Sequence, residues 1–311
     1  MDPMTCGIAS GLDYPSIVAA SERVAWTVDE IFGDRRFDAS RPLVPASWVG
    51  TQALGFLGRD EQRTLNHCRA FSYVHLIGNF EEFVPFHMTG LVQRDARTDR
   101  AQARALLRFG EEEVKHQQLF HRAERVLEQS CGHPFARYFD DDGRAGALAE
   151  AILDHSPLAR FLVLLALEWG TQRHYVESVR DRTDAPVDPL YVEILRAHWV
   201  EEAQHTKSDT LEIARLTREL GAEERRTAFD HLAAIGAMVD AALAGQVEAE
   251  IATLREVSGR TFSTGEVTAL RGTLSESLRA IIMGVALGHP RFASVAVAVS
   301  AEGAASLGIA A

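Results

Sequence analysis

Apolar residues recur every three or four positions through four long stretches of the chain, and this spacing predicts amphipathic helices. Polar, turn-forming residues separate the stretches at residues 94–100, 130–156 and 181–188. The predicted helices cover residues 61–92, residues 101–129, the residues after Ser156-Pro157, and the residues from about Pro189. This order predicts an all-α protein with a four-helix bundle, in which a long crossover joins the second and third helices.

The residues outside the bundle are expected to pack around it. An amphipathic helix is expected over about residues 18–32, one short helix over 145–153, and two further helices over about 223–257 and 264–287. We find no chemistry in the N-terminal arm. The chain is therefore expected to form a single domain with three parts: an arm (1–59), the bundle (60–220), and flanking C-terminal helices and tail (221–311).

Carboxylates and imidazoles interrupt the apolar stripes of all four helices. Glu81 breaks the stripe of the first helix, whereas the stripe through Glu82 is less apolar. Pro85 lies in the same helix and is expected to kink it. On the other helices the interruptions fall at Glu113, His116, Glu168, His198, Glu202 and His205. Glu111 and Glu112 lie off the stripe of the second helix and are expected to be solvated.

These interruptions form a repeated pattern. Glu113 and His116 have the same Glu-x-x-His spacing as Glu202 and His205. Glu81 precedes Glu113 by 32 residues, and Glu168 precedes Glu202 by 34. The midpoints of both intervals fall in the polar turns, so each pair is expected to lie level on two antiparallel helices. Neighbours three and four positions apart share a helix face, which puts His198 in the row of the last pair.

A cluster of buried carboxylates and imidazoles calls for a cation, because burying unpaired charges is very unfavourable. Four carboxylates offset two divalent ions, and the imidazoles favour iron or manganese over calcium or magnesium. Asp209 lies four residues after His205 and is a candidate second-shell acceptor for a metal-bound histidine. The alternatives are an exposed Asp209, a packed His198, and a metal-free bundle with a solvated polar face.

Composition narrows the classes of function. The net charge of -12 argues against a nucleic-acid footprint. Three scattered cysteines are typical of reduced thiols in a cytoplasm, and we find neither a signal peptide nor a stretch of about 18 strongly apolar residues. No flavin or iron–sulfur motif is found, so electrons are expected from an external donor.

The Glu and Glu-x-x-His set is that of ferritin-like dimetal-carboxylate bundles. His198 adds a third histidine one turn before the last pair, giving His-x-x-x-Glu-x-x-His. With this addition the sequence resembles the diiron arylamine N-oxygenases, the p-aminobenzoate N-oxygenase family, over about residues 60 to 215. The resemblance implies one metal-ligand set: Glu81, Glu113, His116, Glu168, His198, Glu202 and His205.

The resemblance also implies a function. The expected cofactor is two iron ions, with manganese as the alternative, and O2 is the co-substrate. The expected reaction converts an aromatic amine, free or carrier-bound, to hydroxylamine, nitroso or nitro products, in natural-product biosynthesis and in a homodimer. The alternatives are a diiron hydroxylase or desaturase that acts on a C–H bond, and a ferroxidase or iron-storage bundle. Storage bundles do not need the flanking helices, which favours an enzyme with a substrate pocket.

Overall fold

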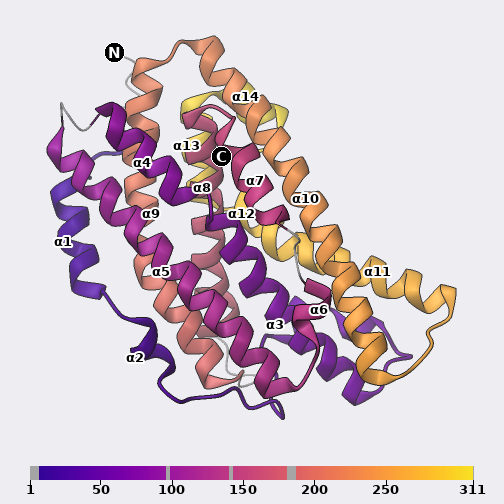
Figure 1. Cartoon of the computed structure of the whole chain (residues 1–311). Coiled ribbons are helices and arrows are strands. Elements are labelled where there is room, and N and C mark those ends of the chain that lie inside the picture. The colour runs from indigo at the N-terminus through magenta and orange to yellow at the C-terminus, as the bar shows by residue number, and fades with distance from the viewer. Residues whose placement is uncertain (1–6, 96–98, 140–142, 181–186, 311) are drawn as a thin grey trace.

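The computed structural model describes residues 7–95, 99–139, 143–180 and 187–310, and every regular element in these ranges is a helix (Figure 1). In the bundle, α3 packs on α5, α5 on α9, and α9 on α8. The predicted all-α, four-helix architecture is confirmed. The bundle helices are α3 (Arg59–Glu81), α5 (Arg100–Cys131), α8 (Pro157–Arg173) and α9 (Pro189–Glu219).

The bundle helices begin where the sequence supplies a cap. Ser156 Oγ accepts the backbone N–H of Ala159 at 3.3 Å, and Asp188 caps α9 in the same way. Pro157 and Pro189 follow in the first turn. The lack of an N–H is harmless there, because N–H groups of the first turn have no acceptor within the helix. The predicted turns at 94–100 and 181–188 lie partly outside the described residues.

The first predicted helix is not continuous. α3 ends at Glu81 and α4 (Val84–Asp95) starts after a short break. The cause is Pro85, which has no N–H to donate to the carbonyl of Glu81 four residues earlier and whose ring clashes with it. The side-chain amide of Gln117 donates to that carbonyl instead, at 3.3 Å. The expected kink is therefore a break, and it places Glu81 at a helix end.

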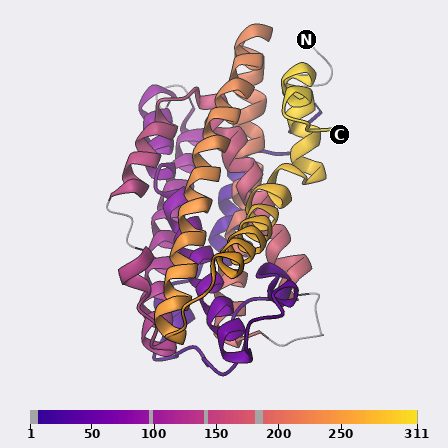
Figure 2. The same cartoon turned by 90° about the vertical axis from the view of Figure 1, so that its right-hand side faces the viewer.

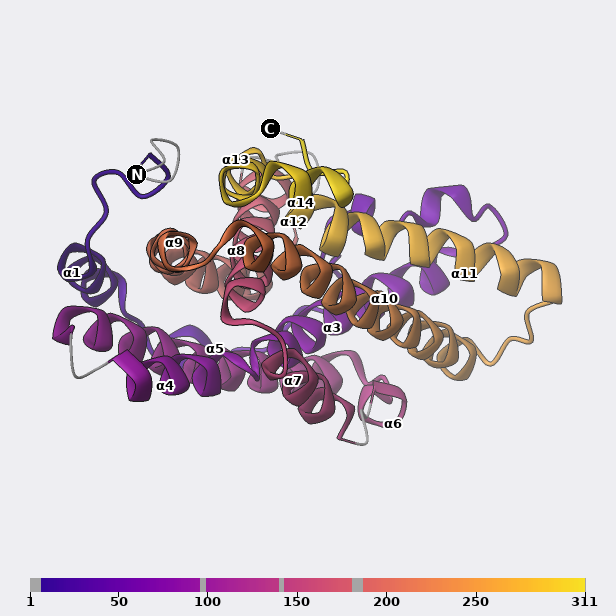
Figure 3. The same cartoon turned by 90° about the horizontal axis from the view of Figure 1, so that it is seen from above.

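The N-terminal arm also contains a break that the pattern did not predict. In place of one helix over 18–32, the structure has α1 (Tyr14–Val24) and α2 (Val28–Phe32). Thr27 and Glu30 form a capping box, in which Glu30 Oε2 accepts the N–H of Thr27 at 2.7 Å. The arm packs on α5 and α9, as Figure 3 shows for α1.

The crossover contains two helices rather than the one expected, α6 (Phe135–Phe139) and α7 (Arg144–Leu153). A π-helical segment, η3 (His174–Arg180), continues α8 beyond its regular end. Two 3-10 turns, η1 (Ala46–Trp48) and η2 (Thr51–Ala53), lie in the last part of the arm, between α2 and α3.

The C-terminal helices cover one side of the bundle. α10 packs along both α3 and α8, and α11 packs on α10 (Figure 2). The two predicted C-terminal helices are present, and two more follow in the tail. The elements are α10 (Ala222–Ser258), α11 (Thr264–Arg279), the π-helical η4 (Ala280–Gly284), α12 (Val285–Leu287), α13 (Pro290–Val299) and α14 (Ala301–Ser306).

α10 is the most apolar long helix of this layer. An 18-residue window in it has a mean hydropathy of 1.3, enough to cross a membrane on length and composition alone. Its packing against α3, α8 and α11 is that of a helix within a folded domain. A buried ion pair holds it there: Arg69 on α3 bonds both carboxylate oxygens of Glu250, at 2.8 and 2.9 Å.

Candidate metal centre

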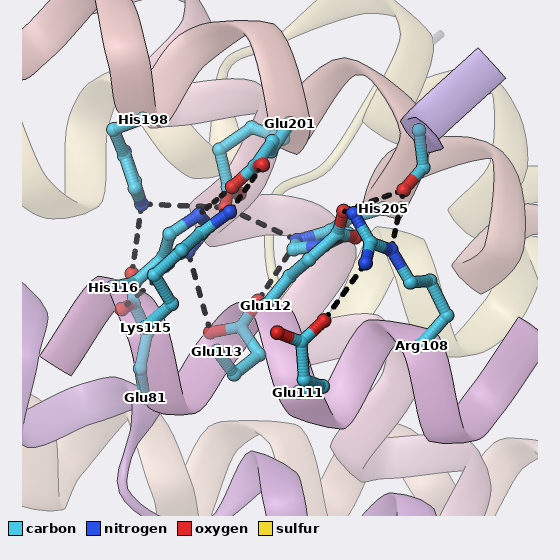
Figure 4. Close-up of polar contacts among 12 residues, drawn as sticks. Glu81, Arg108, Glu111, Glu112, Glu113, Lys115, His116, His198, Glu201 and His205 are labelled. Carbon is cyan, nitrogen blue, oxygen red and sulfur yellow. Dashed lines mark hydrogen bonds and ion pairs between the residues drawn. The ribbon is translucent and has the colours of Figure 1, made fainter. Parts of the chain in front are cut away.

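The seven residues predicted as ligands lie on four helices, and their side chains converge inside the bundle. Figure 4 labels five of them: Glu81, Glu113, His116, His198 and His205. Glu81 comes from the end of α3, and Glu168 from α8. The other residues stand on the two helices that carry the Glu-x-x-His pairs: Glu113 and His116 on α5, and His198, Glu202 and His205 on α9.

Glu202 lies at the middle of the cluster. Its Oε1 lies 3.3 Å from His116 Nδ1, 3.2 Å from His205 Nδ1 and 3.3 Å from His198 Nε2. All three imidazoles thus present a ring nitrogen to one carboxylate. This convergence is what a metal centre requires of its nitrogen ligands.

The ligand atoms fall into two overlapping groups. One contains Glu81, His116, His198 and Glu202, with Glu81 Oε1 at 3.0 Å from His198 Nε2. The other contains Glu113, His116, Glu202 and His205. Glu168 lies beside this second group, with Oε1 at 4.0 Å from His205 Nδ1. Two groups that share members are what a pair of bridged ions would use.

The cluster contains buried polar atoms that have no hydrogen-bond partner within the protein. They are Glu81 Oε2, Glu113 Oε2, His116 Nδ1 and both carboxylate oxygens of Glu168. Such atoms destabilise a fold unless a bound group interacts with them, because they lose their bonds to water on burial and gain none within the protein. Five unpaired ligand atoms of the right chemistry, gathered in one place, fit a pair of metal ions.

The outer nitrogens of two histidines are held by carboxylates that the stripe analysis did not select. His116 donates from Nε2 to Glu201 Oε2 at 3.0 Å, and His205 donates from Nε2 to Glu112 Oε2 at 3.1 Å. Because a carboxylate only accepts, Nε2 of each ring carries a proton, and the inward-facing Nδ1 is the ring atom that a metal ion would bind. The expectation that Glu112 is solvated is wrong, since it is 1% exposed.

Each of these carboxylates is held in turn by a cation. Lys115 Nζ lies 2.5 Å from Glu201 Oε1, and Arg108 lies 2.9 Å from Glu112 Oε1. The hydroxyl of Ser21 in α1 also donates to Glu112, at 2.5 Å. The N-terminal arm, in which we expected no chemistry, therefore contributes to the surroundings of the centre.

Asp209 is buried, but it does not accept from a histidine. Its carboxyl lies beside that of Glu168 and raises the pKa of Glu168, adding to the larger effect of burial. Burial likewise raises the pKa of Asp209. Two buried carboxyls side by side share a proton or need a cation. Asp209 thus stays a candidate for supporting a metal ligand from outside, and the side chain that it faces is Glu168 in place of a histidine.

An aromatic ring packs on each of the three imidazoles. Phe109 stacks on His205 with ring centroids 3.9 Å apart, and Phe120 meets His198 edge-on at 5.0 Å. Trp26, in the arm, is parallel to His116 at 5.9 Å, and Lys115 Nζ lies 4.2 Å from its ring centroid. These contacts restrict the rotation of the ligand side chains.

The pKa values of the histidines in the cluster are shifted in opposite directions. Burial lowers the pKa of His198 well below its usual value, so this imidazole is neutral and donates from Nε2 to Glu81 Oε1 at 3.0 Å. Burial alone would lower the pKa of His116 too, but the nearby carboxylates of Glu113 and Glu201 raise it to about 10. His116 therefore holds a proton that a bound cation would displace.

The sequence did contain a signal for the two outer carboxylates. Both motifs begin with two adjacent acids, Glu112-Glu113 and Glu201-Glu202. The second acid of each pair, Glu113 or Glu202, faces the cluster. The first acid, Glu112 or Glu201, bonds the histidine of the other helix. A doubled Glu-Glu-x-x-His pattern therefore indicates mutual support between the two helices.

The fold and this cluster define the class: a ferritin-like bundle of the dimetal-carboxylate type. The family model of the p-aminobenzoate N-oxygenase AurF matches residues 19–283. The chain therefore belongs to this family, and it is an O2-dependent diiron arylamine N-oxygenase. No curated protein matches the sequence.

Among solved structures, the chain is similar to R2-like ligand-binding oxidases. One, with an aerobically reconstituted metal cofactor after photoconversion, is 14% identical, with 88% of this chain and 93% of that chain covered and a TM-score of 0.42. A mutant of such an oxidase with an anaerobically reconstituted Mn/Fe cofactor is 13% identical, with the same coverage and a TM-score of 0.41.

Proposed function

We propose that two iron ions are held by seven side chains of this chain and that the enzyme uses them to N-oxygenate an aromatic amine. The observation that carries the proposal is the convergence of five unpaired buried ligand atoms beside a third histidine. Manganese stays the alternative metal. The proposed ligands are Glu81, Glu113, His116, Glu168, His198, Glu202 and His205.

The contacts indicate how the ligands divide. Glu113 turns Oε1 to His205 Nδ1 at 2.8 Å and Oε2 to His116 Nδ1 at 3.8 Å. A carboxylate that faces both histidines would be within reach of both ions. Glu81 and His198 would hold the ion beside His116, and Glu168 would hold the ion beside His205. Glu202, which faces all three imidazoles, would also be within reach of both.

The reaction requires reductant as well as oxygen. The reduced diiron centre supplies O2 activation when it is bound. One oxygen atom of O2 is placed on the amine nitrogen, which gives a hydroxylamine. The other oxygen atom is reduced to water, and this reduction uses two electrons and two protons from an external donor. Further rounds give nitroso and nitro products.

The space beside the carboxylates is small, and apolar side chains form much of the rest of its wall. A cavity of about 20 Å³ borders four proposed ligands on the side away from Glu112 and Glu201. Phe80, Leu164 and Leu167 close it. These side chains shield the site from bulk solvent, which strengthens electrostatic interactions within it and protects reactive species from side reactions.

Other features of the proposal come from the family resemblance. We propose that the enzyme is a cytoplasmic homodimer and acts in natural-product biosynthesis on a free or carrier-bound arylamine. The mass of the protein in solution, measured by light scattering, tests the dimer: a monomer at working concentration would contradict it.

The test of function is a single-turnover assay of iron-loaded protein with 18O2, a chemical reductant and a panel of arylamines. We expect two iron atoms per chain and a product that carries 18O on nitrogen. Glu168→Ala is the matched control and should lose iron and product. Oxygen on carbon alone would favour the C–H hydroxylase, and iron oxidation without an organic product would favour the ferroxidase.

A further inference from the structure

We propose that the arylamine reaches the metal centre through an apolar cavity between α8, α10 and α12, and that Leu167 is the gate between this cavity and the metals. The inference rests on the proposed function, because it supplies the entry and specificity element for the same site. It follows from how three cavities share their walls.

The entry cavity has a volume of about 340 Å³ and opens to solvent beside α10. This volume is at the lower end of the roughly 300–1,000 Å³ typical of ligand pockets, and it suits a compound of one or two rings. Its lining is almost wholly aliphatic, with Val163, Leu232 and Ile282 among the residues. Its one charged lining residue, Asp240, is paired with Arg279.

Leu167 connects this cavity to the metals. It lines the entry cavity and also the small cavity of about 20 Å³ that is bordered by Glu81, Glu113, Glu168 and Glu202. Leu167 directly precedes Glu168 in α8, and it is the residue that the linings of the two cavities have in common. A rotation of this leucine would join the two spaces.

The arrangement of the helices explains why the opening lies here. α10 lies over the α3 and α8 side of the bundle, which is the side that the small cavity faces. Beside it, α12 approaches α8 closely: a Cβ placed on Gly170 would lie 3.3 Å from the Cβ of Ala286. The bulky side chains nearby then leave a hollow between α8, α10 and α12.

A second cavity competes for the same role. It has about 280 Å³, lies on the other side of α10, and shares Phe80 with the small cavity. Its lining includes the polar groups of His75, Asn79 and Gln246, which an aromatic ring would have to desolvate. Phe80 is also sealed, at 2% exposed, whereas Leu167 is partly exposed. The observations therefore favour the Leu167 route.

This route gives the substrate an orientation. The amine nitrogen leads towards Leu167 and the metals, and the ring lies among aliphatic side chains. Polar substituents or a carrier attachment opposite the amine stay at the mouth, near the Asp240 and Arg279 pair. The ligand class is thus an arylamine whose amino end is unsubstituted and slender.

Two exposed alanines on α10 provide a matched test. Ala237 lines the entry cavity, and Ala241, one turn later, lines the competing cavity. Ala237→Phe should lower kcat/KM for arylamines by on the order of tenfold or more, because the ring narrows the mouth. Ala241→Phe should leave it unchanged. Both residues lie on the same helix, so a change in helix stability or oligomeric state should affect both variants alike. A difference between the two variants would therefore come from the cavities.

Binding to the metal-free protein separates the route from the reaction. The probe is 2-aminonaphthalene, followed by its own fluorescence. We expect it to bind wild-type protein and Ala241→Phe alike, and Ala237→Phe on the order of tenfold more weakly. Leu167→Ala should raise turnover of the bicyclic amine relative to aniline, while iron content stays at the wild-type value.

Several results would overturn the route. They are a loss of binding in Ala241→Phe but not in Ala237→Phe, equal behaviour of the two variants, and no binding to metal-free wild-type protein. If the wild type N-oxygenates arylamines while Ala237→Phe is unaffected, the route fails and the proposed function stands. If Ala237→Phe weakens binding while the wild type forms no N-oxygenated product, the cavity is supported and the function fails.

Discussion

At the scale of single residues, the centre is built by reciprocal support between α5 and α9. Glu201 orients His116, and Glu112 orients His205, so each motif holds the histidine of the other helix. Outer partners of this kind fix the tautomer of a ligand and raise its basicity. The two Glu-x-x-His pairs are therefore a coupled unit rather than two independent half-sites.

Removing one outer carboxylate should weaken the centre without dismantling it. We expect Glu112→Gln and Glu201→Gln each to lower metal affinity by about 10–100-fold, the usual effect of losing an outer partner. Competition with a chelator, read by metal analysis, measures this. The matched control is Glu111→Gln, because Glu111 is adjacent in sequence and exposed. Equal metal retention in all three variants would contradict the outer-carboxylate role.

The convergence of the seven side chains could be predicted, because each of them interrupts an apolar stripe that faces the inside of the bundle, and such interruptions are visible in sequence. Glu112 could not be found in this way, because it lies off the stripe and becomes buried only against α1 and α9. Its contacts with Ser21 and His205 join residues 91 and 93 positions away. Long-range contacts of this kind leave no periodic trace.

At the scale of helices, the accuracy of the prediction followed local chemistry. The starts of α8 and α9 were predicted because Ser156-Pro157 and Asp188-Pro189 are strong local signals. The sequence predicted a kink at Pro85, but the structure has a break after Glu81. Pro85 cannot donate to the carbonyl of Glu81, and the side chain of Gln117 donates to it instead. Periodicity alone continued across both this break and the one at Thr27.

The ion pair between α3 and α10 should be the main polar link of the C-terminal layer to the bundle. Arg69 and Glu250 are fully buried, and Arg69 also donates to the carbonyls of Trp48 and Leu274. Arg69→Met leaves the Glu250 charge buried and unpaired, which should destabilise the fold by about 3–5 kcal/mol in urea unfolding.

The double variant Arg69→Met with Glu250→Met is the control for that prediction. Replacing both charges by apolar side chains of similar size should recover most of the lost stability. If the single and double variants are equally destabilised, the loss comes from packing rather than from an unpaired charge.

At the scale of the whole molecule, buried neutral histidines outside the centre make the fold sensitive to acid. Burial, reinforced by Arg160 and Arg94, lowers the pKa of His87 from 6.5 to about 3. Above pH 6.5 the ring is neutral in both states and adds no pH dependence. Below it, the unfolded chain binds the proton first, so stability falls as the pH drops towards 3.

His87→Phe should reduce this sensitivity. Between pH 6 and pH 4, we expect the slope of the unfolding free energy against pH to fall by up to about 1.4 kcal/mol per pH unit, the share of one proton. Urea unfolding of metal-free protein at several pH values measures it. The same variant at pH 7.5 reports packing alone. An unchanged slope would show that His87 is not held neutral.

The whole architecture combines a site that sequence could locate with an approach that it could not. The flanking helices were predicted as a layer, but the cavities they form depend on how α10 and α12 pack on α8. Core and cavity side chains look alike in sequence, so Leu167 could not be told from its neighbours. The shared walls of the cavities became visible only in three dimensions.

The central claim is that two metal ions lie among seven named side chains. Anomalous diffraction at the iron edge, on crystals of iron-loaded protein, tests it most directly. We predict two peaks bridged by Glu113 and Glu202, one within coordination distance of His116, His198 and Glu81, the other of His205 and Glu168. A single peak, two peaks elsewhere, or a His198 turned away from the iron would contradict the account.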